Sequence, residues 1–351
     1  MSVRVLLMLI LMASPVLAQG FAGLGGGAQG FAVPQRGVAL SFPQDHAAHP
    51  SYRIEWWYLT ANLKGADGKD FGAQWTLFRS ALAPEEKPGW QSPQLWMGHA
   101  ALTTAEKHYS AERLARGGIG QAGVMREPFR AEIDDWHMAS RAGAAADPLS
   151  ALAVAAGGDH FSYRLKLEAK GPLVPQGEGG YSVKSAAGQA SYYYSQPFYH
   201  VSGTITVDGA EIAVTGQAWF DHEWSSQPLN PDQTGWDWFS LHFDTGEKLM
   251  GFRLRDKGAG FTSATWIAAD GTPQPLAPGA LLVTPLAWED VKGHRVPVQW
   301  RVELPAKRLD IRTRALNDAA WMETQVSYWE GPVTFEGTHP GRGYVEMTGY
   351  E

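Results

Sequence analysis

Short, strand-like segments separated by glycine turns recur along the chain, and they restrict what it can fold into. The clearest example is a pair of aromatic, β-branched segments, YRIEWWYLTANL and FGAQWTLFRS, on either side of a turn at residues 64–69. This arrangement predicts a β-hairpin. Similar segments are separated later by turns at residues 208–209, 245–247 and 270–271. Repeated short strands of this kind indicate an all-β sandwich or barrel.

The length of 351 residues exceeds what one ordinary domain needs, so it favours two domains. The segment SSQPLNPDQT at residues 225–234 is polar and contains two prolines, which is typical of a loop between domains. We therefore predict a first domain over 49–226 and a second over 227–351. An alanine-rich stretch at 141–158 is typical of a short helix or a loop.

The N-terminus has the pattern of an export signal. Arg4 precedes an apolar run at residues 5–12, and small residues lead to a cleavage site after Ala18. We predict a cleaved signal over 1–18 and a protein that works in the periplasm or outside the cell. A glycine-rich linker is expected over 19–48. The chain contains no cysteine, so an exported fold must depend on core burial instead of disulfides.

Several kinds of chemistry are disfavoured by the sequence. A net charge of −7 and the absence of a basic cluster argue against nucleic-acid binding. No Gly-x-Ser-x-Gly elbow is present, and His222-Glu223 lacks the second histidine of a zinc-protease motif. Asp45-His46 and His49 could bind a metal, but their polar loop predicts solvated surface. We therefore expect neither a metal nor a cofactor.

Strand alternation places several polar residues on apolar faces. Glu55 shares a face with Trp57, and Asp237 shares a face with the apolar residues that follow it. Burial of a carboxyl without a cationic partner raises its pKa, so that a proton stays available. Gln74 and His99 lie in similar aromatic contexts.

The segment AWFDHEW carries a second set of polar residues. His222 shares a face with Trp224, whereas Asp221 and Glu223 take the opposite face. One interpretation is an acid–base site within an aromatic pocket. The other is a barrel core whose polar groups are satisfied by hydrogen bonds. The residues alone leave both open.

Several segments together resemble a known family. They are His49-Pro50 followed by EWWY, then AWFDHEWSSQPL, WDWFSLHF and the C-terminal YWEGPVTFEGTHPGRGYVEMTGYE. In this order they are similar to the AttH-like and carotenoid 1,2-hydratase (CrtC) family, over about the whole chain after the signal. The resemblance implies two lipocalin-like β-barrel domains in tandem.

The resemblance also implies a reaction. Carotenoid hydratases of this family add water to a terminal double bond of an acyclic carotenoid without a cofactor. By that analogy Asp237 donates a proton, and Trp224, Trp236 or Trp238 stabilises the carbocation, each by roughly 0.5–2 kcal/mol. His222 then assists the attacking water. Asp237, His222 and Trp224 are thus the expected catalytic residues.

A hydrophobic small molecule, an isoprenoid or a lipid, is the expected ligand. Its expected binding residues are Glu55, Trp57, Gln74, His99, Trp236 and Trp238. The alternative function is a non-catalytic carrier that holds such a molecule between its barrels. Family members accompany export-type transporters, so a membrane transporter is the expected partner of a carrier.

Overall fold

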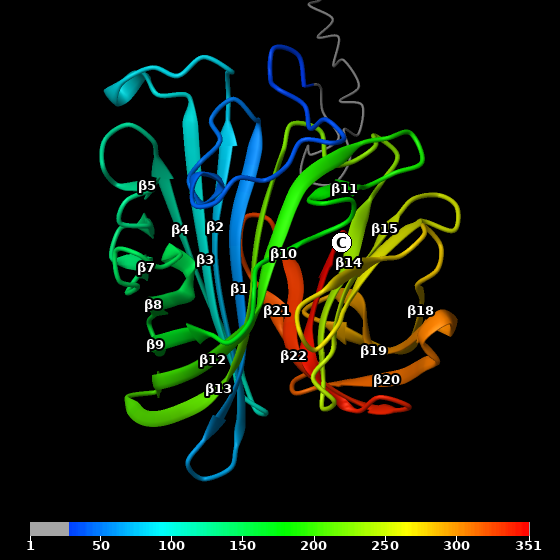
Figure 1. Ribbon diagram of the computed structural model, residues 1–351. Coiled ribbons are helices and arrows are strands. Elements are labelled where there is room, and N and C mark those ends of the chain that lie inside the picture. Colours follow the sequence, from blue (N-terminus) through cyan, green and yellow to red (C-terminus); the bar gives the residue numbers. More distant parts are fainter. Residues whose placement is uncertain (1–27, 351) are drawn as a thin grey trace, which may run out of the picture.

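The computed structural model describes residues 28–350, and its architecture is all-β (Figure 1). The strands form two antiparallel sheets, one a nearly closed barrel and the other a half-barrel. The expected pair of β-barrel domains is therefore confirmed. The described residues contain no α-helix, and their short 3-10 helices are not long or apolar enough to cross a membrane. The predicted signal at 1–18 lies outside them.

The first sheet has the strand order β4-β3-β2-β1-β13-β12-β9-β8-β7-β6-β5, with β10 and β11 pairing with β12. The bounds of its strands are β1 Ile54–Gly65, β2 Asp70–Ala81, β3 Gln94–Thr103, β4 His108–Arg116, β5 Ala122–Met125, β6 Arg130–Ile133, β7 Trp136–Ser140, β8 Ala151–Gly158, β9 Phe161–Ala169, β10 Val174–Pro175, β11 Tyr181–Val183, β12 Ala190–Val207 and β13 Ala210–Ser225.

The second sheet has the order β17-β16-β15-β14-β23-β22-β20-β19-β18, with β21 pairing with β22. Its strands are β14 Gly235–Phe243, β15 Lys248–Arg255, β16 Phe261–Ile267, β17 Pro273–Pro275, β18 Leu282–Val291, β19 His294–Leu304, β20 Leu309–Ala315, β21 Trp321–Met322, β22 Tyr328–Gly337 and β23 Gly341–Thr348. Residues 28–350 also contain four short 3-10 helices, η2 Gln44–His46, η3 Gly89–Gln91, η4 Pro148–Ser150 and η5 Pro305–Lys307.

The predicted hairpin is confirmed as β1 and β2, which pair in register from Ile54 to Lys64. The alanine-rich stretch is different from what we expected. Its second half is strand β8, in which buried and partly buried residues alternate, so its small side chains fit a barrel wall instead of a helix. Part of the expected linker also packs on the fold, because Leu40 and Phe42 contact the first core.

Strand β1 and residues 218–225 of strand β13 are buried on both faces, and this positions the site. Trp57 on β1 points into the first barrel, whereas Tyr58 points toward the second sheet. Tyr58 packs there in a cluster that includes Trp238 of β14 and Tyr344 of β23. The two sheets therefore meet along an aromatic seam, where they lie side by side in Figure 1.

Candidate functional site

A cavity of about 210 Å³ lies in this seam, between the two domains. Both sheets contribute aromatic and aliphatic side chains to its wall. The apolar lining residues are Ile54, Trp56, Tyr58, Phe78, Met97, Tyr193, Pro228, Leu229, Trp236, Trp238, Phe252, Leu254, Val326 and Tyr328. Its charged or titratable lining residues are Glu55, Arg79, His99, Lys184, Asp221, Glu223 and Glu346. An apolar pocket with a few convergent polar groups is the usual form of a small-molecule site.

Glu346 on β23 is the carboxyl from the second domain. It lies directly across the strand pair from Glu330 of β22, and both side chains face the seam, since Glu346 lines the cavity and Glu330 bonds to Tyr58. Trp236 donates its indole N–H to Glu346 Oε1 at 2.5 Å. The Tyr58 hydroxyl donates to Glu330 Oε1 at 2.5 Å, which connects the first domain to this carboxyl pair. Two neighbouring carboxyls in a site with little water cannot both ionise easily, because their negative charges repel each other.

Burial raises the pKa of Glu346 to about 7, although hydrogen bonds from Trp236 and Tyr58 oppose the rise. Burial and the neighbouring Glu346 also raise the pKa of Glu330 well above its usual value. A substantial fraction of Glu346 therefore keeps its proton at neutral pH. That is the protonation state a general acid needs.

Asp221 and Glu223 on β13 are the carboxyls from the first domain. Burial raises the pKa of Asp221 to about 7. Its oxygens accept hydrogen bonds from Tyr193 at 2.8 Å and from Trp219 at 2.7 Å, which favour its ionised form. Glu223 forms an ion pair with Lys184, with a 2.6 Å separation between Nζ and Oε1.

Asp221 accepts from three donors, since Ser195 also bonds to it. Glu346 accepts from Trp236 and Tyr58. Glu346 therefore has more free acceptor capacity than Asp221, and unlike Glu223 it has no ion-pair partner among the described residues, so it is our candidate for donating a proton into the cavity.

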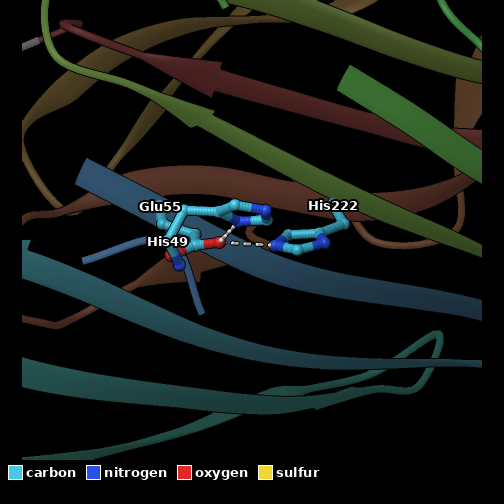
Figure 2. A group of neighbouring side chains, drawn as sticks. All are labelled: His49, Glu55 and His222. Atoms are coloured by element: carbon cyan, nitrogen blue, oxygen red, sulfur yellow. Dashed lines mark hydrogen bonds and ion pairs between the residues drawn. The ribbon is translucent and has the colours of Figure 1, made fainter. Parts of the chain in front are cut away.

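A second polar cluster lies on the opposite face of β1 and β13, inside the first barrel (Figure 2). Glu55 Oε1 accepts from His49 Nδ1 at 2.6 Å and from His222 Nε2 at 2.8 Å. The other carboxylate oxygen accepts from Arg79 Nε at 2.8 Å. The ring of His49 stacks on Trp224 with centroids 3.9 Å apart. Glu55, Arg79 and His222 are almost completely buried.

Charge pairing sets the protonation states of this cluster. His49 and Arg79 hold the pKa of Glu55 far below its usual value, so Glu55 is ionised, although burial opposes the shift. Glu55 and Asp45 raise the pKa of His49 to about 9, also against burial. Burial lowers the pKa of His222 to about 4, so this ring is neutral at neutral pH. The cluster is thus a charged His49–Glu55–Arg79 group with one neutral imidazole.

The prediction of solvated surface for Asp45, His46 and His49 was wrong. His46 is fully buried, and its Nδ1 lies 2.7 Å from the hydroxyl of Tyr194. The side chain of His49 is only 17% exposed. The segment before β1 folds over the barrel, so its polar residues bond to strands that are distant in sequence.

Asp237 has surroundings other than those expected from its strand pattern. It is fully buried, as predicted, but Arg253 and Arg255 pair with its carboxylate at 2.8 and 2.5 Å, and the Tyr350 hydroxyl donates to it at 2.8 Å. The expected lack of a cationic partner is therefore wrong. Its face-mate Phe239 belongs to the second core, so Asp237 points away from the cavity and from His222.

Some of the predicted ligand-binding residues lie at the cavity between the sheets, and others lie inside the first barrel. His99, Trp236 and Trp238 line the cavity, as does Glu55, although its carboxylate belongs to the barrel cluster. Trp57 stacks on His222 inside the barrel, with centroids 4.6 Å apart.

Gln74 was also predicted to bind the ligand. Its side-chain amide donates to the Thr76 hydroxyl, and Gln74 is not among the described residues that line the cavity. Tyr58, Lys184 and Glu346 also line the cavity, and they are not among the residues predicted from the sequence. For Glu346 one signal was available, because alternation in YVEMT places it on the face of Tyr344 and Thr348.

The AttH-like family model matches residues 33–350, which is nearly all of the chain described by the structure. The chain belongs to the AttH-like family. A Nitrosomonas europaea protein assigned as AttH, solved at 2.00 Å resolution, is 34% identical to this family member. The match covers 92% of this chain and 100% of that one, with a TM-score of 0.80.

Two further solved structures share the fold of this AttH-like protein. Kievitone hydratase from Nectria haematococca is 16% identical, with a TM-score of 0.68 and coverage of 91% of this chain and 95% of that chain. CghA in complex with Sch210972 is 14% identical, with a TM-score of 0.56 and coverage of 93% and 97%. A search of curated protein sequences found no match.

Proposed function

We propose that this AttH-like protein adds water to a carbon–carbon double bond of an apolar molecule held in the cavity between its domains. One observation carries the proposal. Glu346 is a partly buried carboxyl whose pKa is raised to about 7, and it lies in a cavity wall made mostly of apolar side chains. A similar fold in kievitone hydratase is consistent with this reaction type.

In the proposed mechanism, protonated Glu346 gives its proton to one alkene carbon. A C–H bond forms, the π bond breaks, and a carbocation develops on the neighbouring carbon. The faces of Trp236, Trp238 and Tyr58 stabilise this cation, each by roughly 0.5–2 kcal/mol. Water attacks the cation, and the proton that it releases returns to Glu346. The sum is one water added per alkene, with the carboxyl regenerated.

The size of the cavity restricts the substrate. A volume of about 210 Å³ is below the range of about 300–1,000 Å³ of typical ligand sites. We therefore propose a compact isoprenoid or phenolic alkene, or one end of a longer chain such as an acyclic carotenoid. The leader-like N-terminus places this activity, in our proposal, in the periplasm or outside the cell.

The test is the conversion of a series of acyclic isoprenoid alkenes of increasing length, followed by mass spectrometry. We expect wild-type protein to form a product heavier by one water. Glu346→Gln should bind the same alkene, measured by tryptophan quenching, but turn it over about a hundredfold or more slowly. The control is Glu336→Gln, which changes an exposed glutamate on the neighbouring strand β22 and should keep full turnover. Tight binding by the wild type without conversion would instead indicate the carrier function.

A further inference from the structure

We propose that His49, Glu55 and His222 form a binding site for a divalent transition-metal ion, of which Zn²⁺ is the best match. This site lies inside the first barrel, on the other face of β1 and β13 from the cavity (Figure 2). It does not depend on the proposed hydration.

The three donor atoms converge from separate parts of the chain. Within residues 28–350, these side chains are the one group whose potential ligand atoms all lie within 4.8 Å of one another. In Figure 2 the two imidazoles meet at the same oxygen, Oε1 of Glu55. Zn²⁺ binds such nitrogens at about 2.0–2.1 Å and such oxygens at about 2.0–2.2 Å, and two histidines with one glutamate are a known ligand set. On binding, protonated His49 would release its Nδ1 proton to solvent, and the proton of neutral His222 would move from Nε2 to Nδ1, which faces the Tyr194 hydroxyl.

The second carboxylate oxygen of Glu55 is already held in place. Oε2 accepts from Arg79 Nε and from the backbone N–H of His49, each at 2.8 Å. Arg79 also donates to the Gln94 side chain and to the carbonyls of His49 and Tyr52. Its position is thus fixed by several acceptors, and Oε1 can bind an ion while Oε2 stays bonded to Arg79.

Both imidazoles have a partner on the nitrogen that would face away from the ion. His49 Nε2 lies 3.4 Å from Asp45 Oδ1, and His222 Nδ1 lies 3.1 Å from the Tyr194 hydroxyl. A carboxylate or hydroxyl in this position orients a metal-binding histidine and raises its basicity. Asp45 and Glu55 together supply two negative charges next to the ion.

The partial exposure of His49 gives the ion a route to the site. Its side chain is 17% exposed, whereas those of Glu55 and His222 are fully buried. The ion would join the segment before β1 to strands β1 and β13. We therefore expect it to hold this segment across the barrel, and to stabilise the native state by binding it in preference to the unfolded chain.

The test is titration of the chelator-treated protein with Zn²⁺ by calorimetry and with Co²⁺ by visible absorption. We expect one ion per chain, a tetrahedral Co²⁺ spectrum and a higher melting temperature with Zn²⁺. His49→Gln, in the segment before β1, should weaken binding at least a hundredfold. Asp45→Asn should weaken it about 10–100-fold, since Asp45 acts through His49.

The control is His160→Gln, which changes an exposed histidine paired with Asp208 and should leave the affinity unchanged. The proposal is overturned if the wild-type protein binds no ion at a one-to-one ratio. It is also overturned if His49→Gln, folded by circular dichroism, binds as tightly as the wild type. None of these measurements uses an alkene, so their outcome is separate from that of the hydration test.

Discussion

Glu346 links the proposed chemistry to the stability of the protein. Its raised pKa means that the folded state holds this proton more tightly than the unfolded chain, where the ordinary value is 4.5. Stability from this group is therefore full below about pH 4.5 and is lost as the pH rises through about 7. The difference between the two values corresponds to about 3 kcal/mol.

We predict that the free energy of unfolding is lower at about pH 8.5 than at about pH 5, and that Glu346→Gln reduces this difference by about 2.5 kcal/mol. His49 also loses its contribution as the pH rises through about 9, but it does so in both proteins. Urea denaturation at the two pH values measures the difference. An unchanged pH dependence in Glu346→Gln would show that Glu346 is ionised throughout this range.

The ion pairs of Asp237 with Arg253 and Arg255 give a second prediction, on stability. Asp237→Asn leaves Arg253 and Arg255 without their carboxylate in a largely buried place. Removing one partner of such a pair costs about 3–5 kcal/mol, so the variant should unfold at a clearly lower urea concentration. Because Asp237 points away from the cavity, turnover by the folded variant should stay within a few-fold of wild type. A hundredfold loss of turnover at unchanged stability would instead support the role implied by the family resemblance.

The candidate site shows how far residues alone can be interpreted. Alternation correctly separated Asp221 and Glu223 from His222 and Trp224. It could not show which face points into the barrel and which points toward the second domain, because both faces of β13 are buried over residues 218–225. The partners of Asp237 were also hidden, since the pairing of β14 with β15 brings Arg253 opposite it.

At the scale of the elements, the repeated aromatic and β-branched segments predicted most strands, and the all-β class followed from them. The alanine-rich strand β8 was missed because alanine favours helices by intrinsic propensity. Its place between β7 and β9 and the burial of every second residue outweigh that propensity. Such tertiary effects are not visible in a local window of sequence.

A glycine controls how closely the two sheets approach. Gly72 lies on β2, and a Cβ added there would be 2.6 Å from Cγ of Pro332 on β22. We predict that Gly72→Ala destabilises the protein by about 1–3 kcal/mol, because the sheets must separate slightly. Gly123→Ala, where a Cβ would meet no atom within 4 Å, is the control. Equal melting temperatures for the two variants would show that the seam adjusts freely.

At the scale of the whole molecule, the sequence alone favoured two domains but could not separate barrels from sandwiches. The family resemblance supplied that choice, and the two sheets confirm it. The cavity requires both sheets, since Tyr58 and Asp221 come from the first and Trp238 and Glu346 from the second. No local pattern could have shown this joint site, because it depends on how the domains pack.

The N-terminal sequence leads to a prediction about the exported protein. Cleavage after Ala18 should give a mature chain that begins at Gln19. Sequencing the N-terminus of protein recovered from outside the cytoplasm measures this directly. Recovery of chains that retain Met1 on membranes would contradict a cleaved signal.

The proposed function requires Glu346 to protonate an alkene carbon of a ligand in the cavity between the domains. The most direct measurement is the reaction of a bound acyclic isoprenoid in D₂O, followed by mass spectrometry of the product. The proposed mechanism predicts an alcohol with one non-exchangeable deuterium on the carbon next to the hydroxyl-bearing carbon, formed by the wild type and lost in Glu346→Gln. Recovery of the bound alkene unchanged and free of deuterium from the wild type would contradict it.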